Sequence, residues 1–383
     1  MMTMKERIKR LFKQDCQHID RILITLVLAL VLIGSIMVAS ASYAYAASRY
    51  GDSGYFTRKQ LVFVALGLVI MLAVSRIDTA SLRHAVIPIY AVTVLLLLAT
   101  LAFGLTGNGA QRWIAIGPFT FQPSELAKLA LVLTLAEYFT RYGDKLVLRG
   151  KNRLIYGIVL PLGITGLLAG LVVLQRHLSG LIIITSIGLT IMFLCGSPIK
   201  PMAILGGFGL VGVGALALTL DYARERITVW LDPAAYPLEG GWQTLQGLMA
   251  IGSGGFFGLG LGKSRLKYSW VSEPANDFIF TITCEELGFL GASAILFLFF
   301  LFIRRGYQIA TRCRESFPRI VALGITSKVA IQVLLNVAVI TNTIPNTGIS
   351  LPFFSYGGSS LLMLFAEMGI LLSISKKSDL TYC

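Results

Sequence analysis

Asp277 has the clearest potential for chemistry, because it lies where a polar, glycine-rich segment meets a long apolar run. The stretch 272–280 reads SEPANDFIF, and the apolar residues that follow are numerous enough to cross a bilayer. A carboxylate at such a junction can take a proton from a hydroxyl group beside the membrane surface. The same position also suits the N-cap of a helix that starts near Phe278, so two interpretations are open from this residue alone.

Glu125 and Lys128 form a second candidate pair. Pro123-Ser124-Glu125 is typical of a helix start, with proline in the first turn and a carboxylate near the positive end of the helix dipole. This start places Glu125 and Lys128 one turn apart on the same face of a helix that we expect to cross the membrane. The pair can be a structural ion pair or can contact a substrate, and both roles are compatible because an ion pair can line a cavity.

Cations of the outer polar segments are the third group. The longest such segment, 221–279, contains Arg226 and a tract with nine glycines, which leads to Lys263, Arg265 and Lys267. These last three can bind a lipid pyrophosphate or can form a plain stripe that faces lipid head groups. Short amphipathic or re-entrant helices are predicted within the segment, where apolar residues recur at helical spacing: Trp242, Leu245, Leu248 and Met249.

Nucleotide binding is excluded despite the sequence Gly262-Lys263-Ser264. A phosphate loop needs a glycine where Phe257 stands, and no strand precedes the segment. Nothing in the spacing of the five cysteines and three histidines suggests a structural metal site, and we expect the cysteines to be free thiols.

The segment from Pro345 to Ser360 breaks the chain with prolines and glycines and then supplies several hydroxyl groups. Small residues where a membrane helix begins favour close helix packing. Hydroxyl groups there can also line a cavity, and Ser355 and Ser359 are the candidates for substrate contact.

Five further charged groups fall within predicted membrane helices. Glu285 and Glu286 are expected to belong to a packing or hydrogen-bonding network, with catalytic support as the alternative. Glu137 and Glu367 are expected near the inner helix ends, where water solvates them. Lys328 lies deeper, so it needs a partner or extends to the interface.

The elements that must position these groups are membrane helices. Hydrophobic residues make up 55% of the chain and charged residues 14%, which excludes a soluble domain. We predict an all-α polytopic protein: a tail at 1–21, one membrane domain at 22–375 and a second tail at 376–383. Ten spans are expected, near 22–42, 59–75, 85–103, 124–140, 155–174, 178–196, 201–220, 280–303, 319–342 and 355–375.

Basic residues predict the orientation, since loops rich in Lys and Arg stay in the cytoplasm. With a cytoplasmic N-terminus the inner segments hold twenty-one basic residues and the outer segments ten. Both termini then face the cytoplasm, and Asp277 and the large loop between the seventh and eighth helices face outward. The net charge of +14 reflects this pattern and anionic lipid rather than a nucleic-acid partner. The first apolar run is too long for a cleavable signal and is read as a retained anchor.

Five motifs in this order resemble the SEDS family of shape, elongation, division and sporulation proteins, which includes FtsW, RodA and SpoVE. They are GNGAQRWIAIGPFTFQPSELAK (107–128), QRHLSG (175–180), GWQTLQGLMAIGSGG (241–255), ANDFIFTITCEELGFLG (275–291) and PNTGISLPFFSYGGSSLL (345–362). The resemblance covers nearly the whole chain after the N-terminal tail. One departure is Arg176, where relatives usually have proline, and this concerns the local turn.

The resemblance implies a ten-helix fold and a peptidoglycan glycosyltransferase that polymerises lipid II in the plasma membrane. It also implies a class B penicillin-binding protein and other divisome proteins as partners. Asp277 matches the essential outer aspartate of the family, and Glu125 and Lys128 match its buried acid and lysine. The ending and the short tails are closer to the division and sporulation branch than to the elongation branch.

Such a reaction requires a base for the acceptor hydroxyl and charge compensation for the leaving pyrophosphate. Asp277 is the expected base of a direct inverting transfer. The compensating cation is expected among Arg112, Arg226, Lys263 and Lys267, with Mg²⁺ or Mn²⁺ as a possible aid. A lipid II flippase and a non-catalytic division scaffold are the alternatives, although transporters tend to carry internal repeats that this chain lacks.

Overall fold

Long apolar helices dominate the computed structural model. It describes residues 20–107, 110–117, 119–146, 151–204, 206–207, 221–237, 240–268 and 275–376. Seven helices in this part are long and apolar enough to cross a membrane, and the chain is therefore a multi-pass membrane protein. They are α2 (Arg21–Tyr50), α3 (Tyr55–Val74), α5 (Val86–Phe103), the continuous helix Lys151–Leu174, α13 (Ile279–Thr311), α14 (Ser316–Ile340) and α15 (Gly358–Ser375). The helix Lys151–Leu174 comprises α7 (Lys151–Leu154), the π-helical turn η2 (Ile155–Val159) and α8 (Leu160–Leu174).

Two further helices occupy predicted spans without meeting the same length or hydropathy criteria. They are α6 (Pro123–Tyr142) and the shorter apolar helix α9 (Leu178–Leu194). Within the described residues, nine of the ten predicted spans thus coincide with helices. The tenth prediction, 201–220, falls mostly outside the described residues, so the ten-helix count stays a prediction.

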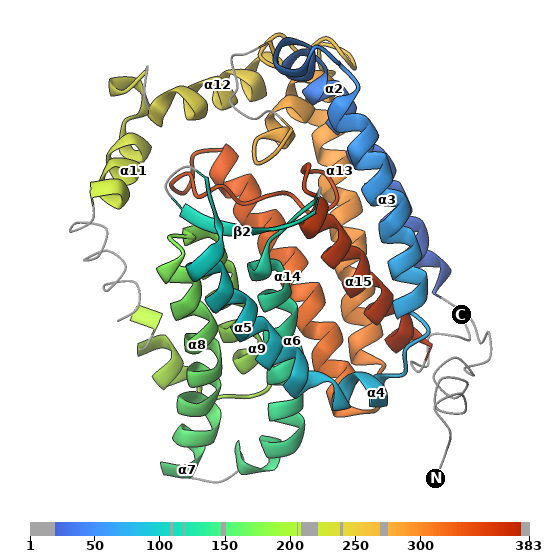
Figure 1. Ribbon diagram of the computed structural model, residues 1–383, viewed down its shortest axis with the longest axis vertical. Helices are drawn as coiled ribbons and strands as arrows, with labels where there is room; N and C mark the ends of the chain where they lie inside the picture. Colours follow the sequence, from blue (N-terminus) through green and yellow to red (C-terminus); the bar gives the residue numbers. More distant parts are fainter. Residues whose placement is uncertain are drawn as a thin grey trace.

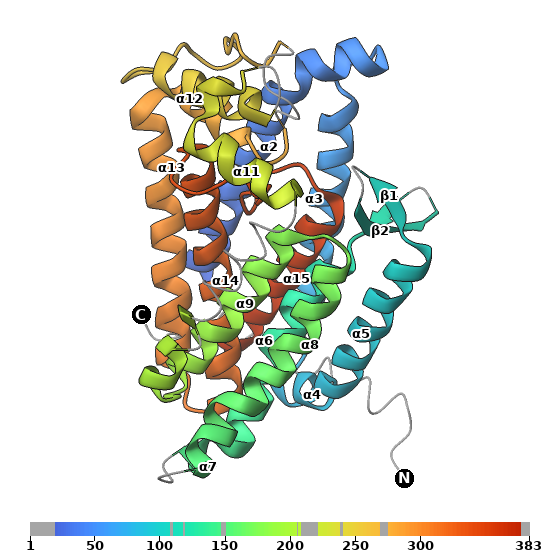
Figure 2. The same ribbon diagram turned by 90° about the vertical axis from the view of Figure 1, so that its left-hand side faces the viewer.

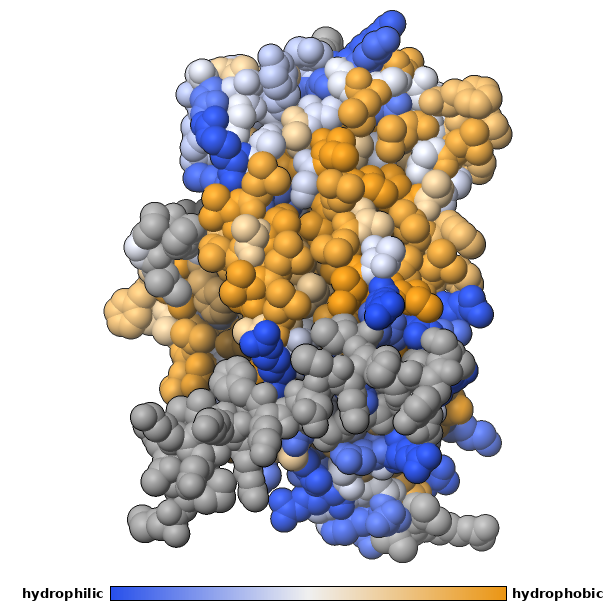
Figure 3. Space-filling model, turned by 90° about the vertical axis from the view of Figure 1, so that its right-hand side faces the viewer, coloured by the Kyte–Doolittle hydropathy of each residue, from blue (hydrophilic) through white to orange (hydrophobic). Residues whose placement is uncertain are grey.

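Burial separates the core helices from those that face lipid. In the most apolar windows of α14 and α15, 67% and 72% of residues are buried, against 17% and 22% for α3 and α5. Helix α6 packs against α5, α9 and α14, so it lies inside the bundle (Figures 1 and 2). This enclosure explains how α6 carries charged residues within the membrane. Viewed from the side in Figure 3, hydrophobic residues form a band between hydrophilic ends.

The loop between α5 and α6 contains strands, which the all-α prediction did not include. Strands β1 (Leu105–Gly107), β2 (Ala110–Ile116) and β3 (Phe119–Phe121) pair in the antiparallel order β1-β2-β3. Gly117, which has φ 60°, begins the turn between β2 and β3, a conformation that favours glycine. Strand pairing provides hydrogen bonds for the backbone N–H and C=O groups of this loop, which lies against α5, α6 and α15.

The long segment before α13 forms short helices, as the apolar spacing predicted. Helix α11 (Asp221–Leu231), the short turn η3 (Pro233–Ala235) and α12 (Gly240–Ser253) follow one another, and α12 packs on α13. Figures 1 and 2 show α11, α12 and the small sheet toward the same end of the bundle. Other connections between the long helices include α4 (Thr79–His84) and the 3-10 turn η1 (Gly143–Leu146).

The expectation for Glu367 was wrong. Its side chain is fully buried, and both of its oxygens accept hydrogen bonds from the ammonium of Lys328, at 2.8 and 2.7 Å. The reason is that α15 stays enclosed down to Ser375, so its C-terminal half has no access to water. Lys328 therefore has the partner that its depth required. Glu137 is partly exposed and pairs with Arg83 of α4.

Candidate active site

Asp277 ends the turn that leads into α13, and two neighbouring segments hold its backbone. The side-chain amide of Asn336 in α14 donates to the carbonyl oxygens of Asp277 (3.0 Å) and Ile349 (2.7 Å). The backbone N–H of Tyr356 donates to Ala275 at 2.8 Å. The N-cap position of α13 is Phe278, and no side chain caps it. The N-cap position thus falls on the residue that follows Asp277.

The carboxylate of the half-buried Asp277 faces the loop between α14 and α15. A Cβ atom added to Gly348 would lie 2.9 Å from Oδ2 of Asp277 and 3.9 Å from the hydroxyl of Ser179. Ser179 is in the first turn of α9, and its hydroxyl donates to the carbonyl of Thr347. Groups from α9, α13 and the α14–α15 loop therefore converge on one point.

Arg226 reaches the same loop from α11. Its guanidinium donates to the carbonyl of Asn346, whose side-chain amide donates to Gln243 of α12 at 3.2 Å. The Asn346 side-chain oxygen accepts from the backbone N–H of Gly348 at 3.2 Å. The segment around Asn346 thus joins α11 and α12 to the residue that contacts Asp277, and Arg226 binds this segment two residues before Gly348.

Arg112 lies on β2 and meets the turn between α8 and α9. Its guanidinium donates to the carbonyl of Arg176 at 2.6 Å. Arg176 has φ 53°, which a proline ring does not permit, so the local turn differs from one built on proline. The next residue, His177, is buried; burial, with the nearby charges of Arg112 and Lys128, lowers its pKa to about 3. His177 is therefore neutral at physiological pH.

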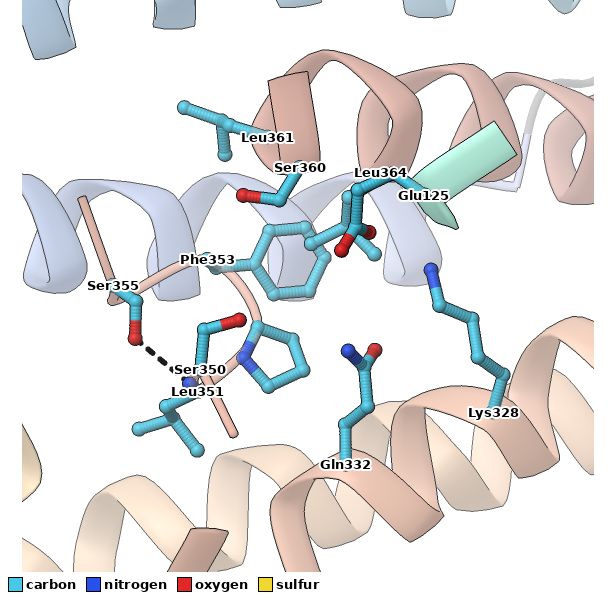
Figure 4. A pocket seen from close by; sticks show the side chains of 11 residues that line it. Glu125, Lys328, Gln332, Ser350, Leu351, Phe353, Ser355, Ser360, Leu361 and Leu364 are labelled. Atoms are coloured by element: carbon cyan, nitrogen blue, oxygen red, sulfur yellow. Dashed lines mark hydrogen bonds between the residues drawn. The ribbon is translucent and has the colours of Figure 1, made fainter. Parts of the chain in front are cut away.

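Glu125 and Lys128 form the predicted ion pair, with 2.7 Å between Nζ and Oε1 and both side chains buried. Glu125 also lines a cavity of about 20 Å³ between α6, α14, α15 and the α14–α15 loop. In Figure 4 the carboxylate of Glu125, the ammonium of Lys328 and the amide of Gln332 point toward it. This volume holds about one or two water molecules and no sugar.

The two candidate serines have different surroundings. Ser355 lines the cavity, and its hydroxyl accepts from the N–H of Leu351 at 2.7 Å. Ser359 instead donates to the carbonyl of Thr120 at 2.7 Å, which ties the start of α15 to β3. Its neighbour Ser360 is the residue that faces the cavity.

The predicted cations Lys263 and Lys267 do not lie together on an open surface. Lys263 is exposed, whereas Lys267 is buried and pairs with Glu286 at 2.9 Å. Glu285 and Glu286 do belong to a hydrogen-bonding network, as expected from their depth. Among the described residues, no group of three or more His, Cys, Asp or Glu side chains could hold a metal ion.

Sequence reasoning did not select Asn336, Gln332 or Ser179 as site residues. Gln332 and Asn336 follow Lys328 at four-residue intervals on one face of α14, and this spacing could have indicated them. Ser179 stands among other hydroxyl residues of α9 and gave no signal. Lys328, the one lysine of α14, did give a signal in the sequence, because a buried charge requires a partner.

Comparisons with known proteins agree with this arrangement. The model of the FtsW, RodA and SpoVE family, described as a cell cycle protein, matches residues 20–380. The chain belongs to this family. It is 38% identical to stage V sporulation protein E of Bacillus subtilis strain 168, over 94% of this chain and 97% of that protein. It is 37% identical to a probable peptidoglycan glycosyltransferase FtsW of Trichlorobacter lovleyi, over 93% of both chains.

Solved structures of family members share the fold. A chain of a peptidoglycan synthase complex, described as coordinating polymerization and crosslinking, superposes with a TM-score of 0.77 at 29% identity, covering 93% of this chain and 97% of that one. The rod shape determining protein RodA of Thermus thermophilus gives a TM-score of 0.71 at 28% identity, covering 96% and 99%. The departure at Arg176 thus lies within an otherwise shared architecture.

Proposed function

We propose that this protein is a peptidoglycan glycosyltransferase that polymerises lipid II into glycan strands at the outer face of the plasma membrane. The observation that carries the proposal is the convergence of Asp277, Gly348 and Ser179 beside Arg226, in a member of the FtsW, RodA and SpoVE family. A carboxylate with a cation nearby, at the end of a membrane helix, suits a reaction on a lipid-linked sugar.

In the proposed reaction Asp277 accepts the proton of the acceptor 4-hydroxyl of N-acetylglucosamine as that oxygen attacks the donor anomeric carbon. The bond between the N-acetylmuramic acid and its α-linked pyrophosphate breaks, and a β-1,4 bond forms with inversion. One base is sufficient, in contrast to the two carboxylates of retaining glycosidases. Such a base contributes roughly 10²–10⁴-fold to the rate.

The leaving pyrophosphate needs positive charge. Arg226 and Arg112 are favoured, because the loops that each contacts, at Asn346 and Arg176, immediately precede Gly348 and Ser179. Exposed Lys263 is a further candidate at the surface. Glu125, Lys128 and the serines near the cavity would contact substrate once the cavity enlarges, since its present volume is too small for a sugar.

A divalent cation, Mg²⁺ or Mn²⁺, would act here through the substrate. Mg²⁺ is commonly held by one or two carboxylates together with substrate phosphates. The pyrophosphate of the substrate would carry such a metal, and the charge of the metal would add to that of the arginines.

The proposed cellular setting follows from the orientation and the relatives. Ten helices with both termini in the cytoplasm would place Asp277 on the outer side. A class B penicillin-binding protein would cross-link the product, since the similar synthase complex is described by both activities. The similar proteins include a sporulation protein and an FtsW protein. This protein is therefore proposed to act with divisome proteins in division or sporulation.

The test uses purified protein with its partner penicillin-binding protein and labelled lipid II. Asp277→Asn is expected to abolish glycan chain formation while lipid II binding remains. Asp52→Asn is the matched control, because Asp52 is an outer carboxylate whose partner is the exposed Arg58. Normal chain formation by Asp277→Asn would refute the base assignment. Movement of lipid II across liposomes without polymerisation would favour a flippase, and neither activity would favour a scaffold.

A further inference from the structure

Helix α13, which follows Asp277, is broken at Gly288. This residue has φ 68° and ψ −170°, a conformation outside the helical region. A Cβ atom there would lie 2.2 Å from the backbone nitrogen of Gly258, so only glycine fits. The break separates a short outer half-helix, 279–287, from the rest of α13. Asp277 lies at the outer end of this half-helix.

The glycine-rich segment 254–260 supplies the backbone partners that the break removes. The N–H groups of Leu259 and Gly260 donate to the carbonyls of Glu285 and Glu286, both at 3.0 Å. In return, the N–H of Phe289 donates to the carbonyl of Gly255 at 2.9 Å. Non-helical backbone near a membrane requires such pairing, and the half-helix therefore rests on this segment.

The residues that follow this segment bind the carboxylates of Glu285 and Glu286. Glu285 accepts hydrogen bonds from the backbone N–H of Arg265, at 3.0 Å, and from the hydroxyl of Ser264. Glu286 accepts from the ammonium of Lys267, at 2.9 Å, and from the backbone N–H of Ser264, at 3.3 Å. The two carboxylates, Ser264 and Lys267 are almost fully buried.

Helix α2 completes the network. The hydroxyl of Ser40 donates to Glu286 at 2.7 Å, and the ammonium of Lys267 also reaches this hydroxyl, at 3.3 Å. We call the five side chains that meet here the clasp; they are Ser40, Ser264, Lys267, Glu285 and Glu286. The clasp joins α2, the outer loop and the half-helix of α13.

Stability alone does not explain the clasp, because removing its charged groups from water costs free energy. Well-packed apolar residues often stabilise a protein as much as a buried ion pair does, or more. A buried ion pair, however, fixes one geometry through its directional hydrogen bonds. A fixed geometry matters most where a reacting group must be held accurately, since a displacement of about 1 Å can cost roughly 10²-fold in rate.

We propose that the clasp positions Asp277, with Lys267 and Glu286 as positioning residues for the transfer reaction. The inference rests on the proposed role of Asp277 as the base. Because Gly288 separates the half-helix from the rest of α13, its orientation depends on two supports. Asn336 holds the outer end at the carbonyl of Asp277, and the clasp holds the inner end. Lys267 then serves the reaction without touching the substrate.

The decisive variant removes both charges of the buried pair, Lys267→Met with Glu286→Gln. Neither partner is left as an uncompensated buried charge, so the protein is expected to fold with nearly wild-type thermal stability. We expect kcat for lipid II polymerisation to fall at least about tenfold while KM changes less than about twofold. A milder variant, Ser40→Ala, removes one hydroxyl from the clasp and is expected to lower kcat by a smaller factor.

The matched control is Arg83→Met with Glu137→Gln, which removes a partly exposed pair that joins α4 to α6. It is expected to leave kcat and KM unchanged. Wild-type kcat in both clasp variants would overturn the positioning role, and a rise in KM with unchanged kcat would make Lys267 a substrate ligand. Asp277→Asn in the same assay separates the base role of Asp277 from the positioning role of the clasp. If it stays active, the base assignment fails; if it is inactive while the clasp variants are normal, only the positioning role fails.

Discussion

The carboxylate of Asp277 lies directly against Gly348, and a methyl group on that glycine would lie 2.9 Å from Oδ2. Gly348 also has φ 69°, a conformation that side chains rarely adopt. Gly348→Ala therefore both strains the loop and pushes the carboxylate away. We expect kcat for lipid II polymerisation to fall at least about tenfold, measured with the purified enzyme and its partner.

Gly51→Ala is the control that separates these two effects. Gly51 has φ 67°, and no atom lies within 4 Å of an added Cβ atom. Its alanine variant has the same backbone strain, of about 1–2 kcal/mol, without any contact to Asp277. Equal losses of activity in the two variants would show that strain, rather than displacement of the carboxylate, causes the effect.

Loss of the buried pair Lys328–Glu367 is expected to be costly for stability. Lys328→Met leaves Glu367 charged and enclosed, and breaking a buried pair in this way costs about 3–5 kcal/mol. Arg83→Met breaks a partly exposed pair and is expected to cost at most about 1 kcal/mol. Thermal unfolding of the purified proteins measures both, and equal unfolding temperatures would contradict the prediction. Adding Glu367→Gln to Lys328→Met should restore most of the loss.

The pair Glu125–Lys128 offers a test of substrate contact that stability does not obscure. Glu125→Gln with Lys128→Met removes both charges together, so the fold should retain most of its stability. If the pair contacts substrate as proposed, kcat/KM for lipid II should fall at least about tenfold. Nearly wild-type kcat/KM, at a normal unfolding temperature, would assign the pair a purely structural role.

Most of the membrane architecture could be predicted from the sequence because its signal is local. Long apolar runs exclude other structures, and the helix start at Pro123 is visible in the neighbouring residues. The pairing of Glu125 with Lys128 followed from helical spacing in the same way. Asp277 was selected as a candidate because loop and helix meet there in the sequence, and the resemblance to the family motif favoured a base over a helix cap.

Contacts between distant segments were beyond such reasoning. Nothing near Glu367 in the sequence indicates that Lys328 is its partner, and the expectation of solvation failed for that reason. The contact between Gly258 and Gly288 likewise depends on how the segment before α13 folds back on that helix. The small sheet was missed because two of its three strands have only three residues, and pairing within the loop stabilises them more than their own residue preferences do.

The burial of His177 predicts a dependence of stability on pH. Its pKa is about 3 in the folded protein, against an ordinary value near 6.5, because burial and the nearby Arg112 and Lys128 disfavour the charged imidazole. Between these values the unfolded chain binds a proton that the folded protein does not, so stability falls as pH drops below about 6.5. At pH 5 this amounts to roughly 2 kcal/mol for a single group. We expect His177→Gln to lose less thermal stability than the wild type between pH 7 and pH 5, since glutamine does not titrate. The comparison uses each protein's own change with pH, which removes any constant effect of the substitution at the start of α9. An identical pH dependence in both proteins would show that the histidine is not the group responsible.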